Sequence, residues 1–265
     1  MSMTSLKVLP KEKIRAAFSR AASTYDSASG VQTQSAERLI RRMIADGCAA
    51  GNSLDVGMGT GAATRRLARR IGGRVYGCDM AWGMVSFAKR NGGGLLISQA
   101  DMEKLPYRDN IFDIVFSNIA YQWSADLRGA LAEVQRVLKP AGRFYFSILA
   151  RGSLRELASA LKAAVQGDPR YDLLPARETI VSALAGAGLT IRWDEEFVIT
   201  RYYDSPLELI KTFKKMGAAK ISEDVVFGMG KRRLFFDMVE AYKKNFTRGR
   251  KVFATYNVVM GCAQG

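Results

Sequence analysis

Short apolar runs alternate along the chain with segments in which apolar residues recur every three or four positions. The runs at residues 53–56, 74–79, 95–97 and 111–118 have the length and composition of buried strands. The amphipathic segments between them predict helices that cross from one strand to the next. This alternation favours an α/β protein with a mainly parallel sheet.

The pattern continues on both sides of this core. Two helical patterns between Lys11 and Met43 precede the first strand, and further strands are expected at 143–148, 190–200 and 251–262, the first of them after a turn at 139–142. About fifty residues near the end carry two helical patterns, 206–216 and 231–244, that such a core does not need. We therefore predict one domain over residues 1–265, with a helical cover at 1–50, a core at 51–200 and 251–265, and a helical lid at 201–250.

The first strand runs into a turn with glycines at alternate positions, Gly57, Gly59 and Gly61. Because glycine lacks a Cβ, its backbone adopts positive φ angles and approaches a ligand closely, which predicts a nucleotide-like cofactor. The same residues also satisfy a dinucleotide-binding pattern. Asp55, just before the turn, would repel a pyrophosphate but would suit a cationic or amine-bearing ligand. This carboxylate argues against a nicotinamide dinucleotide.

Composition narrows the possible chemistry. The chain has 40 basic and 25 acidic residues and no histidine, so it lacks the commonest general base and metal ligand. Its three cysteines have no metal-ligand spacing, and we expect no metal site. The formal charge of +15 predicts an anionic partner, whether nucleic acid, acidic protein or small molecule, with a merely solvated surface as the alternative. Without a membrane-spanning stretch or signal-peptide pattern, the protein is expected to be cytoplasmic, with no membrane partner.

Several motifs in order carry a resemblance to a known class. After the glycine turn, Asp79 ends the second strand, Asp101 and Met102 follow the third, and Asn118 ends the fourth. This succession resembles the class I S-adenosylmethionine-dependent methyltransferases. The resemblance implies a Rossmann-like sheet of seven mostly parallel strands with helices on both faces. It also implies S-adenosylmethionine as cofactor, with S-adenosylhomocysteine as the product.

The resemblance assigns roles to these residues. Asp79 lies where such folds bind the two ribose hydroxyls, and Met80 would lie near the ribose or adenine. Asp101 would accept a hydrogen bond from the adenine amino group while Met102 packs on the ring, although Asp101 could also be a surface acid. The expected cofactor-binding residues are Asp55, Gly57, Gly59, Gly61, Asp79, Met80, Asp101, Met102 and Asn118.

The catalytic end of the sheet follows the fourth strand. Gln122 and Trp123 lie just beyond it, where open parallel sheets bind ligands. Tyr25, on a turn between the covering helices, is well placed to close over a methyl donor, with simple packing as the alternative. We predict these three residues as catalytic.

A narrower resemblance extends over nearly the whole chain. The segments 18–22, 117–123, 152–157 and 213–218 look like those of the malonyl-[acyl-carrier-protein] O-methyltransferases of biotin synthesis. Met58 and Asn257 are small departures, at positions where cysteine and histidine are common. The resemblance implies methylation of the free carboxylate of a malonyl group, carried on phosphopantetheine by an acidic acyl carrier protein. That carboxylate is already ionised at neutral pH, so the reaction needs no base.

Other functions remain open at this stage. Trans-aconitate methyltransferase shares the core and an Asn-x-x-x-Gln-Trp segment, but the lid residues around Lys214 favour the malonyl enzymes. An RNA methyltransferase, or a protein that only binds the cofactor, is a further alternative. Nucleic acid is the less expected partner, because residues 118–121 lack the two prolines typical of amino-methylating enzymes. For the malonyl carboxylate we expect pairing with Lys214 or Arg20.

Overall fold

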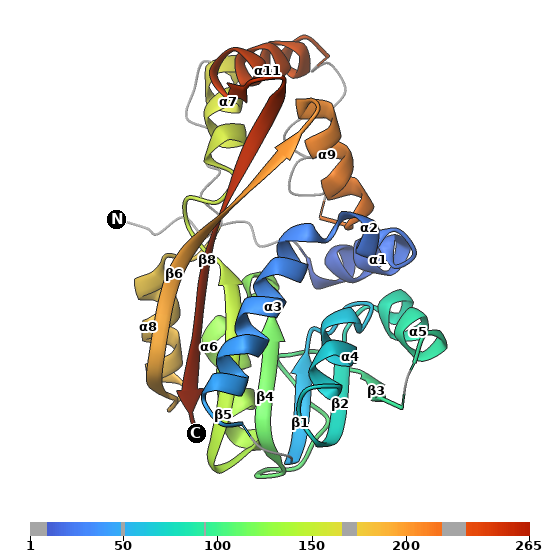
Figure 1. Cartoon of the computed structure of the whole chain (residues 1–265), viewed down its shortest axis with the longest axis vertical. Coiled ribbons are helices and arrows are strands. Elements are labelled where there is room, and N and C mark those ends of the chain that lie inside the picture. Colours follow the sequence, from blue (N-terminus) through green and yellow to red (C-terminus); the bar gives the residue numbers. More distant parts are fainter. Residues whose placement is uncertain (1–9, 49–50, 93, 166–173, 219–231) are drawn as a thin grey trace.

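A twisted sheet with helices on both faces forms the body of the protein (Figure 1). The computed structural model describes residues 10–48, 51–92, 94–165, 174–218 and 232–265. The strand order is β3-β2-β1-β4-β5-β8-β6, with β1 to β5 parallel and β8 antiparallel to both β5 and β6. The expected Rossmann-like α/β fold is confirmed. The strands are β1 (Gly51–Val56), β2 (Gly73–Asp79), β3 (Leu96–Gln99), β4 (Phe112–Asn118), β5 (Leu138–Leu149), β6 (Thr190–Tyr203), β7 (Thr247–Arg248, paired with β8) and β8 (Lys251–Gln264).

The helices form two layers on the sheet and a group beyond its carboxyl edge. The helix α3 packs on the face formed by β4, β5 and β8, whereas α6 and α8 cover the opposite face, and α1 and α2 lie above the ends of the parallel strands (Figure 1). Among the described residues, no helix is long and apolar enough to cross a membrane. The helices are α1 (Lys11–Ala21), α2 (Tyr25–Ala28), α3 (Gly30–Ala45), α4 (Ala62–Ala68), α5 (Trp82–Arg90), η1 (Tyr121–Trp123), α6 (Leu127–Val137), α7 (Arg155–Val165), α8 (Arg177–Gly186), α9 (Pro206–Lys215) and α11 (Arg232–Asn245).

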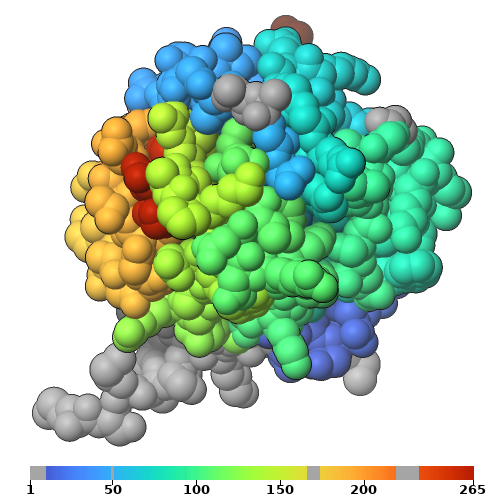
Figure 2. All heavy atoms as spheres, turned by 90° about the horizontal axis from the view of Figure 1, so that it is seen from below, coloured from blue at the N-terminus to red at the C-terminus, as the bar shows by residue number. Residues whose placement is uncertain are grey.

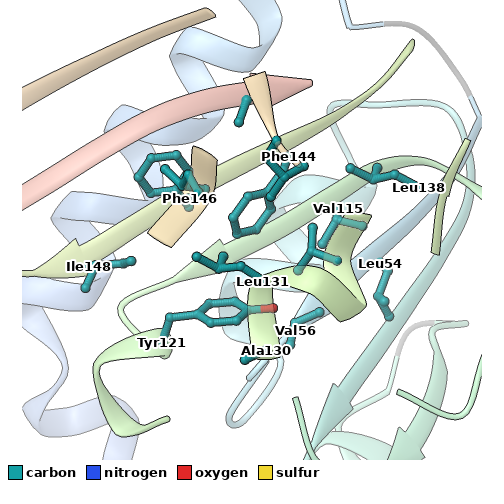
Figure 3. Packing of buried hydrophobic residues seen from close by; sticks show 14 of the residues in the cluster. Leu54, Val56, Val115, Tyr121, Ala130, Leu131, Leu138, Phe144, Phe146 and Ile148 are labelled. Atoms are coloured by element: carbon teal, nitrogen blue, oxygen red, sulfur yellow. The ribbon is translucent and has the colours of Figure 1, made fainter. Parts of the chain in front are cut away.

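The central strands are buried on both faces, as the continuous apolar runs predict. On β5, Phe144 and Phe146 point toward α6, where they pack near Leu131 and Tyr121 (Figure 3). Tyr145, between them, points to the other face and packs with Met43 of α3. The two sides of β5 thus belong to two separate apolar clusters that hold the helix layers on the sheet.

The strands β6 and β8 are longer than the rest of the sheet needs. Their antiparallel pairing continues to Tyr203 and Val252, past the carboxyl edge of the parallel strands, and α7, α9 and α11 gather around this extension (Figure 1). Tyr203, Phe213 and Tyr242 belong to a further apolar cluster in this upper part. Residues 201–203, which we assigned to the lid, are therefore the end of a core strand.

The predicted turn at 139–142 is a second local difference. Residues 138–149 form one strand, and the register against β4 shifts between Phe112 and Ile114. Ala141 has a φ of 64°, so this segment is an irregularity inside β5 rather than a connection before it.

The opposite end of the molecule is built from the starts of the parallel strands. Figure 2 shows this face, where the last residues of the chain lie between β6 and β5. The helix α4 returns the chain from the carboxyl end of β1 toward this end, where β2 begins. The glycine turn, at the carboxyl end of β1, therefore lies on the side of the molecule turned away from this view.

Candidate functional site

The glycine turn after β1 needs glycine at its first position for two reasons. Gly57 has a φ of 73°, and a Cβ placed there would lie 2.4 Å from the Cβ of Ala120. Its amide donates to the carbonyl of Cys78 at 2.9 Å, which ties the turn to β2. Gly59 and Gly61 also have positive φ values, 56° and 76°, and Gly61 is the N-cap of α4. The turn therefore presents bare backbone at the carboxyl edge of the sheet.

Asp55 lies beneath this turn as a nearly fully buried carboxylate. It accepts a hydrogen bond from Thr64 Oγ1 at 2.6 Å. Burial, and to a lesser degree the charge of Asp79, raises the pKa of Asp55 to about 7, although the Thr64 hydrogen bond acts in the opposite direction. A buried carboxylate without a cationic partner is costly, and a cationic ligand would relieve this cost.

Asp79, at the end of β2, is held by backbone donors. Its Oδ1 accepts from the Ala81 amide at 2.8 Å, and its Oδ2 accepts from the Gly59 amide at 2.9 Å. Burial raises its pKa, although both hydrogen bonds favour the ionised form. Each carboxylate oxygen retains a further lone pair. The carboxylate is therefore oriented toward the turn and can still accept hydrogen bonds from a ligand.

A small cavity of about 50 Å³ lies between the glycine turn and the N-terminal helices. Five of the predicted site residues meet in its lining: Tyr25, Asp55, Gly57, Gly59 and Asn118. Burial raises the pKa of Tyr25, so its hydroxyl stays protonated at neutral pH and can donate a hydrogen bond. The other lining residues are Asp26, Ser29, Gln32, Thr33, Ala36, Met58, Thr60, Ala62, Ala63 and Arg66.

Two buried amide oxygens in this region have no hydrogen-bond partner among the described residues. They are Oε1 of Gln32, in the cavity wall, and Oε1 of Gln122. Asn118 donates through Nδ2 to the carbonyl of Gln32 at 3.1 Å and accepts from Ser147. Buried acceptors of this kind are normally satisfied. The oxygen of Gln32 is therefore available for a donor group that enters the cavity.

Gln122 and Trp123 lie near this cavity but do not line it. The side-chain amide of Gln122 donates through Nε2 to the carbonyl of Ile119 at 3.0 Å. Ile119 has a φ of 51°, which is unusual for a β-branched residue. The ring of Trp123 packs edge-on against Phe18 with centroids 5.3 Å apart. In this structure both residues hold the segment after β4 and the first helix in position.

The predicted adenine-binding residues lie beside the turn, and one of them is paired with the first helix. Lys11 Nζ lies 2.7 Å from Asp101 Oδ2 and 2.5 Å from Glu103 Oε2, so it ties α1 to this loop. The methyl carbon of Met102 lies 3.9 Å from the position that a Cβ on Gly57 would take. The carbonyl of Met80 accepts from Gln99 Nε2 at 2.9 Å.

The two predicted acceptor-binding cations lie elsewhere. Arg20 is exposed at the end of α1, and Lys214 is exposed on α9. Neither belongs to the cavity lining. The structure thus brings together the residues predicted around the glycine turn and leaves these two at the surface.

The sequence did not single out several residues that contribute to the site. Gln32 and Thr60 line the cavity, and Thr60 donates to Asp26 at 2.6 Å. Lys11 reaches Asp101 across ninety positions of sequence. The sequence shows only the helical periodicity around Gln32, and that periodicity does not distinguish a residue that faces a cavity from one that faces the core.

The residues present suit a cofactor that carries an amine or sulfonium at one end and a ribose at the other. Asp55 and the free oxygen of Gln32 can hold a cationic group, and Asp79 can accept from hydroxyls. The glycine turn presents bare backbone to such a ligand, and Gly57 itself packs against Ala120, where a Cβ would lie 2.4 Å from the Ala120 Cβ.

Comparison with known proteins identifies the family to which the chain is similar. Residues 54–146 match a family described as a methyltransferase domain. A malonyl-[acyl-carrier protein] O-methyltransferase of Geobacter sulfurreducens is 34% identical over 264 residues, covering 96% of this chain and 98% of the relative. The protein of the same name from Hahella chejuensis is 35% identical over 252 residues, covering 94% of this chain and 88% of the relative.

A solved structure gives the same fold. The YcgJ protein of Bacillus subtilis has a TM-score of 0.60 against this chain at 18% identity, covering 86% of this chain and 98% of that one. This likeness concerns the fold alone, whereas the sequence alignments extend along nearly the whole chain.

Proposed function

The chain belongs to the malonyl-[acyl-carrier protein] O-methyltransferases, and from this membership we propose that it transfers a methyl group from S-adenosylmethionine to the free carboxylate of a malonyl group on acyl carrier protein. The product is the methyl ester that primes the pimeloyl chain of biotin. The alignment that carries this proposal covers both the cofactor-binding half and the α9 region. The alternative acceptor, trans-aconitate, lacks such support.

The residues around the glycine turn are proposed to hold the donor. Bound S-adenosylmethionine would supply a methyl group on a positively charged sulfur. Asp55 and Gln32 would bind the ammonium end, Asp79 would accept from the ribose hydroxyls, and Met102 would pack on the adenine. Asp101 would have to share its carboxylate between Lys11 and the adenine amino group.

The remaining residues position the reactants instead of moving protons. The acceptor carboxylate is ionised at neutral pH, which agrees with a chain that contains no histidine. Alignment of the attacking oxygen with the methyl group and sulfur is worth roughly 7–11 kcal/mol. Tyr25 would cover the donor from above, while Asn118, Gln122 and Trp123 would fix the segment that faces it.

The carrier protein is proposed to dock beside α1 and α9. These helices are adjacent, since Thr24 Oγ1, in the short link that follows α1, donates to the carbonyl of Lys215 at the end of α9, at 2.8 Å. They carry six exposed cations, and none of the six forms an ion pair with another described residue: Lys13, Arg15, Arg20, Lys211, Lys214 and Lys215. An acidic carrier would complement this surface. The sequence also places Lys231, Arg232 and Arg233 at the start of the next helical pattern, and we expect these cations to face the carrier; Lys231 and the side chain of Arg232 lie outside the described residues, and Arg233 is exposed.

Incubation with labelled S-adenosylmethionine tests the reaction. We expect label in malonyl-carrier protein, in an ester that mild alkali releases, and little in trans-aconitate or total RNA. The Asp79→Ala variant should bind the donor more weakly, because one or two charge-assisted hydrogen bonds worth roughly 1.5–3 kcal/mol each are lost. Preferential labelling of RNA would refute the proposed acceptor.

A further inference from the structure

Arg201 occupies an unusual place at the upper end of β6. Side chains alternate along a strand, so Arg201 shares a face with the buried residues Ile199 and Tyr203. Its guanidinium lies against Gly30, where a Cβ would come within 2.8 Å of Nη2 and 3.0 Å of Cζ. In this arrangement the guanidinium packs directly on the backbone of Gly30, and a side chain at position 30 would displace it.

Arg201 is an exposed arginine beside the start of a helix. It forms no ion pair with another described residue, unlike Arg177 of α8, which pairs with Asp194 on the same strand at 2.6 Å. It lies beside the start of the sixteen-residue helix α3, which has no side-chain cap because Ser29 Oγ donates to the carbonyl of Asp26. A helix N-terminus carries a partial positive charge and repels a cation. An anion bound between this helix start and the guanidinium would be stabilised by both.

Two buried tyrosines add a further hydrogen-bond donor. The hydroxyls of Tyr203 and Tyr256 lie 2.9 Å apart, so one donates to the other. The hydrogen of the second hydroxyl has no acceptor among the described residues, although Tyr256 is only 3% exposed. Burial raises the pKa of both hydroxyls and keeps them protonated, with the charge of Arg201 acting against that rise. A free donor, a free guanidinium and an uncapped helix start thus meet at one place.

We infer that Arg201, the start of α3 and the Tyr203–Tyr256 pair form the binding site for the carboxylate of the acceptor. This inference rests on the proposed function. An arginine holds a carboxylate through two parallel hydrogen bonds and leaves lone pairs free for attack. The place is next to the donor site, because Ser29, the neighbour of Gly30, lines the cavity. Arg20, Lys214 and Arg201 are all exposed and outside that lining, but only Arg201 contacts the residue next to Ser29.

The test compares Arg201→Met with a matched control on the same strand. Arg192→Met removes an exposed arginine of β6 whose Nη1 donates to Gln264 Oε1 at 3.2 Å. With malonyl-coenzyme A as the small acceptor, we expect kcat/KM to fall by roughly 10²-fold in Arg201→Met and to stay unchanged in Arg192→Met. Arg201→Lys should recover part of the loss, and Tyr256→Phe should lose about tenfold because one hydrogen bond to an ion disappears.

Binding measurements separate the carboxylate from the rest of the acceptor. Acetyl-coenzyme A lacks the carboxylate, so its affinity for protein saturated with S-adenosylhomocysteine should be the same in wild type and Arg201→Met. Malonyl-coenzyme A should bind the wild type more tightly than acetyl-coenzyme A and lose this advantage in the variant. The thermal midpoint and the affinity for S-adenosylmethionine should not change.

Three results would overturn the inference. One is an unchanged preference for malonyl over acetyl thioester in Arg201→Met. Another is weaker binding of S-adenosylmethionine itself, which would assign Arg201 to the carboxylate of the donor. The third is that Lys214→Met, and not Arg201→Met, shows the full loss of kcat/KM for malonyl-coenzyme A. If the wild type fails to methylate malonyl thioesters, the proposed function fails, and the binding comparison still decides whether Arg201 recognises a carboxylate.

Discussion

At the scale of single residues, the burial of the Asp55 carboxylate lowers the free energy of unfolding when the carboxylate is ionised. Its pKa is raised to about 7 by burial, so the folded protein binds a proton more tightly than the unfolded chain does between about pH 4 and pH 7. The free energy of unfolding therefore falls as pH rises through this window and then levels off. A ligand cation beside the carboxylate would reverse the penalty.

The Asp55→Asn variant should reveal this penalty. At pH 8 we expect it to be more stable than the wild type by up to about 4 kcal/mol, and at pH 4.5 to be similar. Urea unfolding at the two pH values measures the difference. Asp113→Asn is a control for which we expect a loss of stability at pH 8. The hydrogen bonds from Lys139 and Asn52 outweigh partial burial and lower the pKa of Asp113, so its ionised form stabilises the folded protein. Equal effects of Asp55→Asn at both pH values would contradict the argument.

The sequence was sufficient to place residues at the candidate site where the chemistry is local. Asp55 and Gly57 lie two positions apart, and a carboxylate before a glycine turn already limits the ligand. Arg201 and Gln32 gave no such signal, because their roles depend on Gly30 and on a cavity that only the folded chain assembles. Lys214 was singled out within a motif, yet a motif does not reveal which side of its helix faces the solvent.

At the scale of elements, the contact between α9 and α1 depends on Gly217. It follows the C-cap of α9 with a φ of 74°, and a Cβ there would lie 2.7 Å from the carbonyl oxygen of Ala17. Gly47 follows the C-cap of α3 with a φ of 70° and has no atom within 4 Å of its Cβ position. The two glycines thus share a backbone conformation and differ in their surroundings.

Replacement by alanine separates conformation from contact. Gly47→Ala should cost about 1–2 kcal/mol of unfolding free energy from backbone strain alone. Gly217→Ala should cost a further 1–3 kcal/mol or so, because the added methyl group forces α9 away from α1. Hydrogen exchange of the α9 amides should accelerate only in Gly217→Ala. If the two variants lose the same stability, the close approach of the helices is unimportant.

The succession of elements could be read from periodicity, but their exact extent could not. The helix α9 lies where the apolar period predicted it. The segment 139–142 has the composition of a turn, yet β4 continues to pair on both sides of it. Likewise β6 continues to Tyr203, because β8 supplies a partner that no local pattern indicates. Pairing between distant segments decided both differences.

At the scale of the whole molecule, the charge of +15 and the exposed cations of α1 and α9 predict salt-sensitive capture of the carrier. Raising the ionic strength from about 0.1 M to about 1 M shortens the Debye length from about 10 Å to about 3 Å. We expect kcat/KM for malonyl-carrier protein to fall much more steeply than kcat/KM for malonyl-coenzyme A.

Reversal of Lys214 and Lys215 to glutamate should reproduce the salt effect at low ionic strength, with a loss of about tenfold or more for the carrier substrate. The matched control reverses Arg69 and Arg70, an exposed adjacent pair just after α4, where the chain turns back toward the start of β2. Donor affinity should be unchanged in both. If salt lowered kcat/KM equally for the two substrates, these cations would only be solvated surface charges and would not bind the carrier.

The uninterrupted pairing of β6 with β8 also bears on how this architecture can be altered. The ribbon is anchored in the core, and its register determines that Ile199, Arg201 and Tyr203 face the start of α3. The proposed donor site lies at the glycine turn, and the proposed acceptor site lies on the protruding end. A chimaera that exchanged only this end with α7, α9 and α11, while keeping the register through Ile199 and Tyr256, would change the molecule that receives the methyl group without rebuilding the half that supplies it.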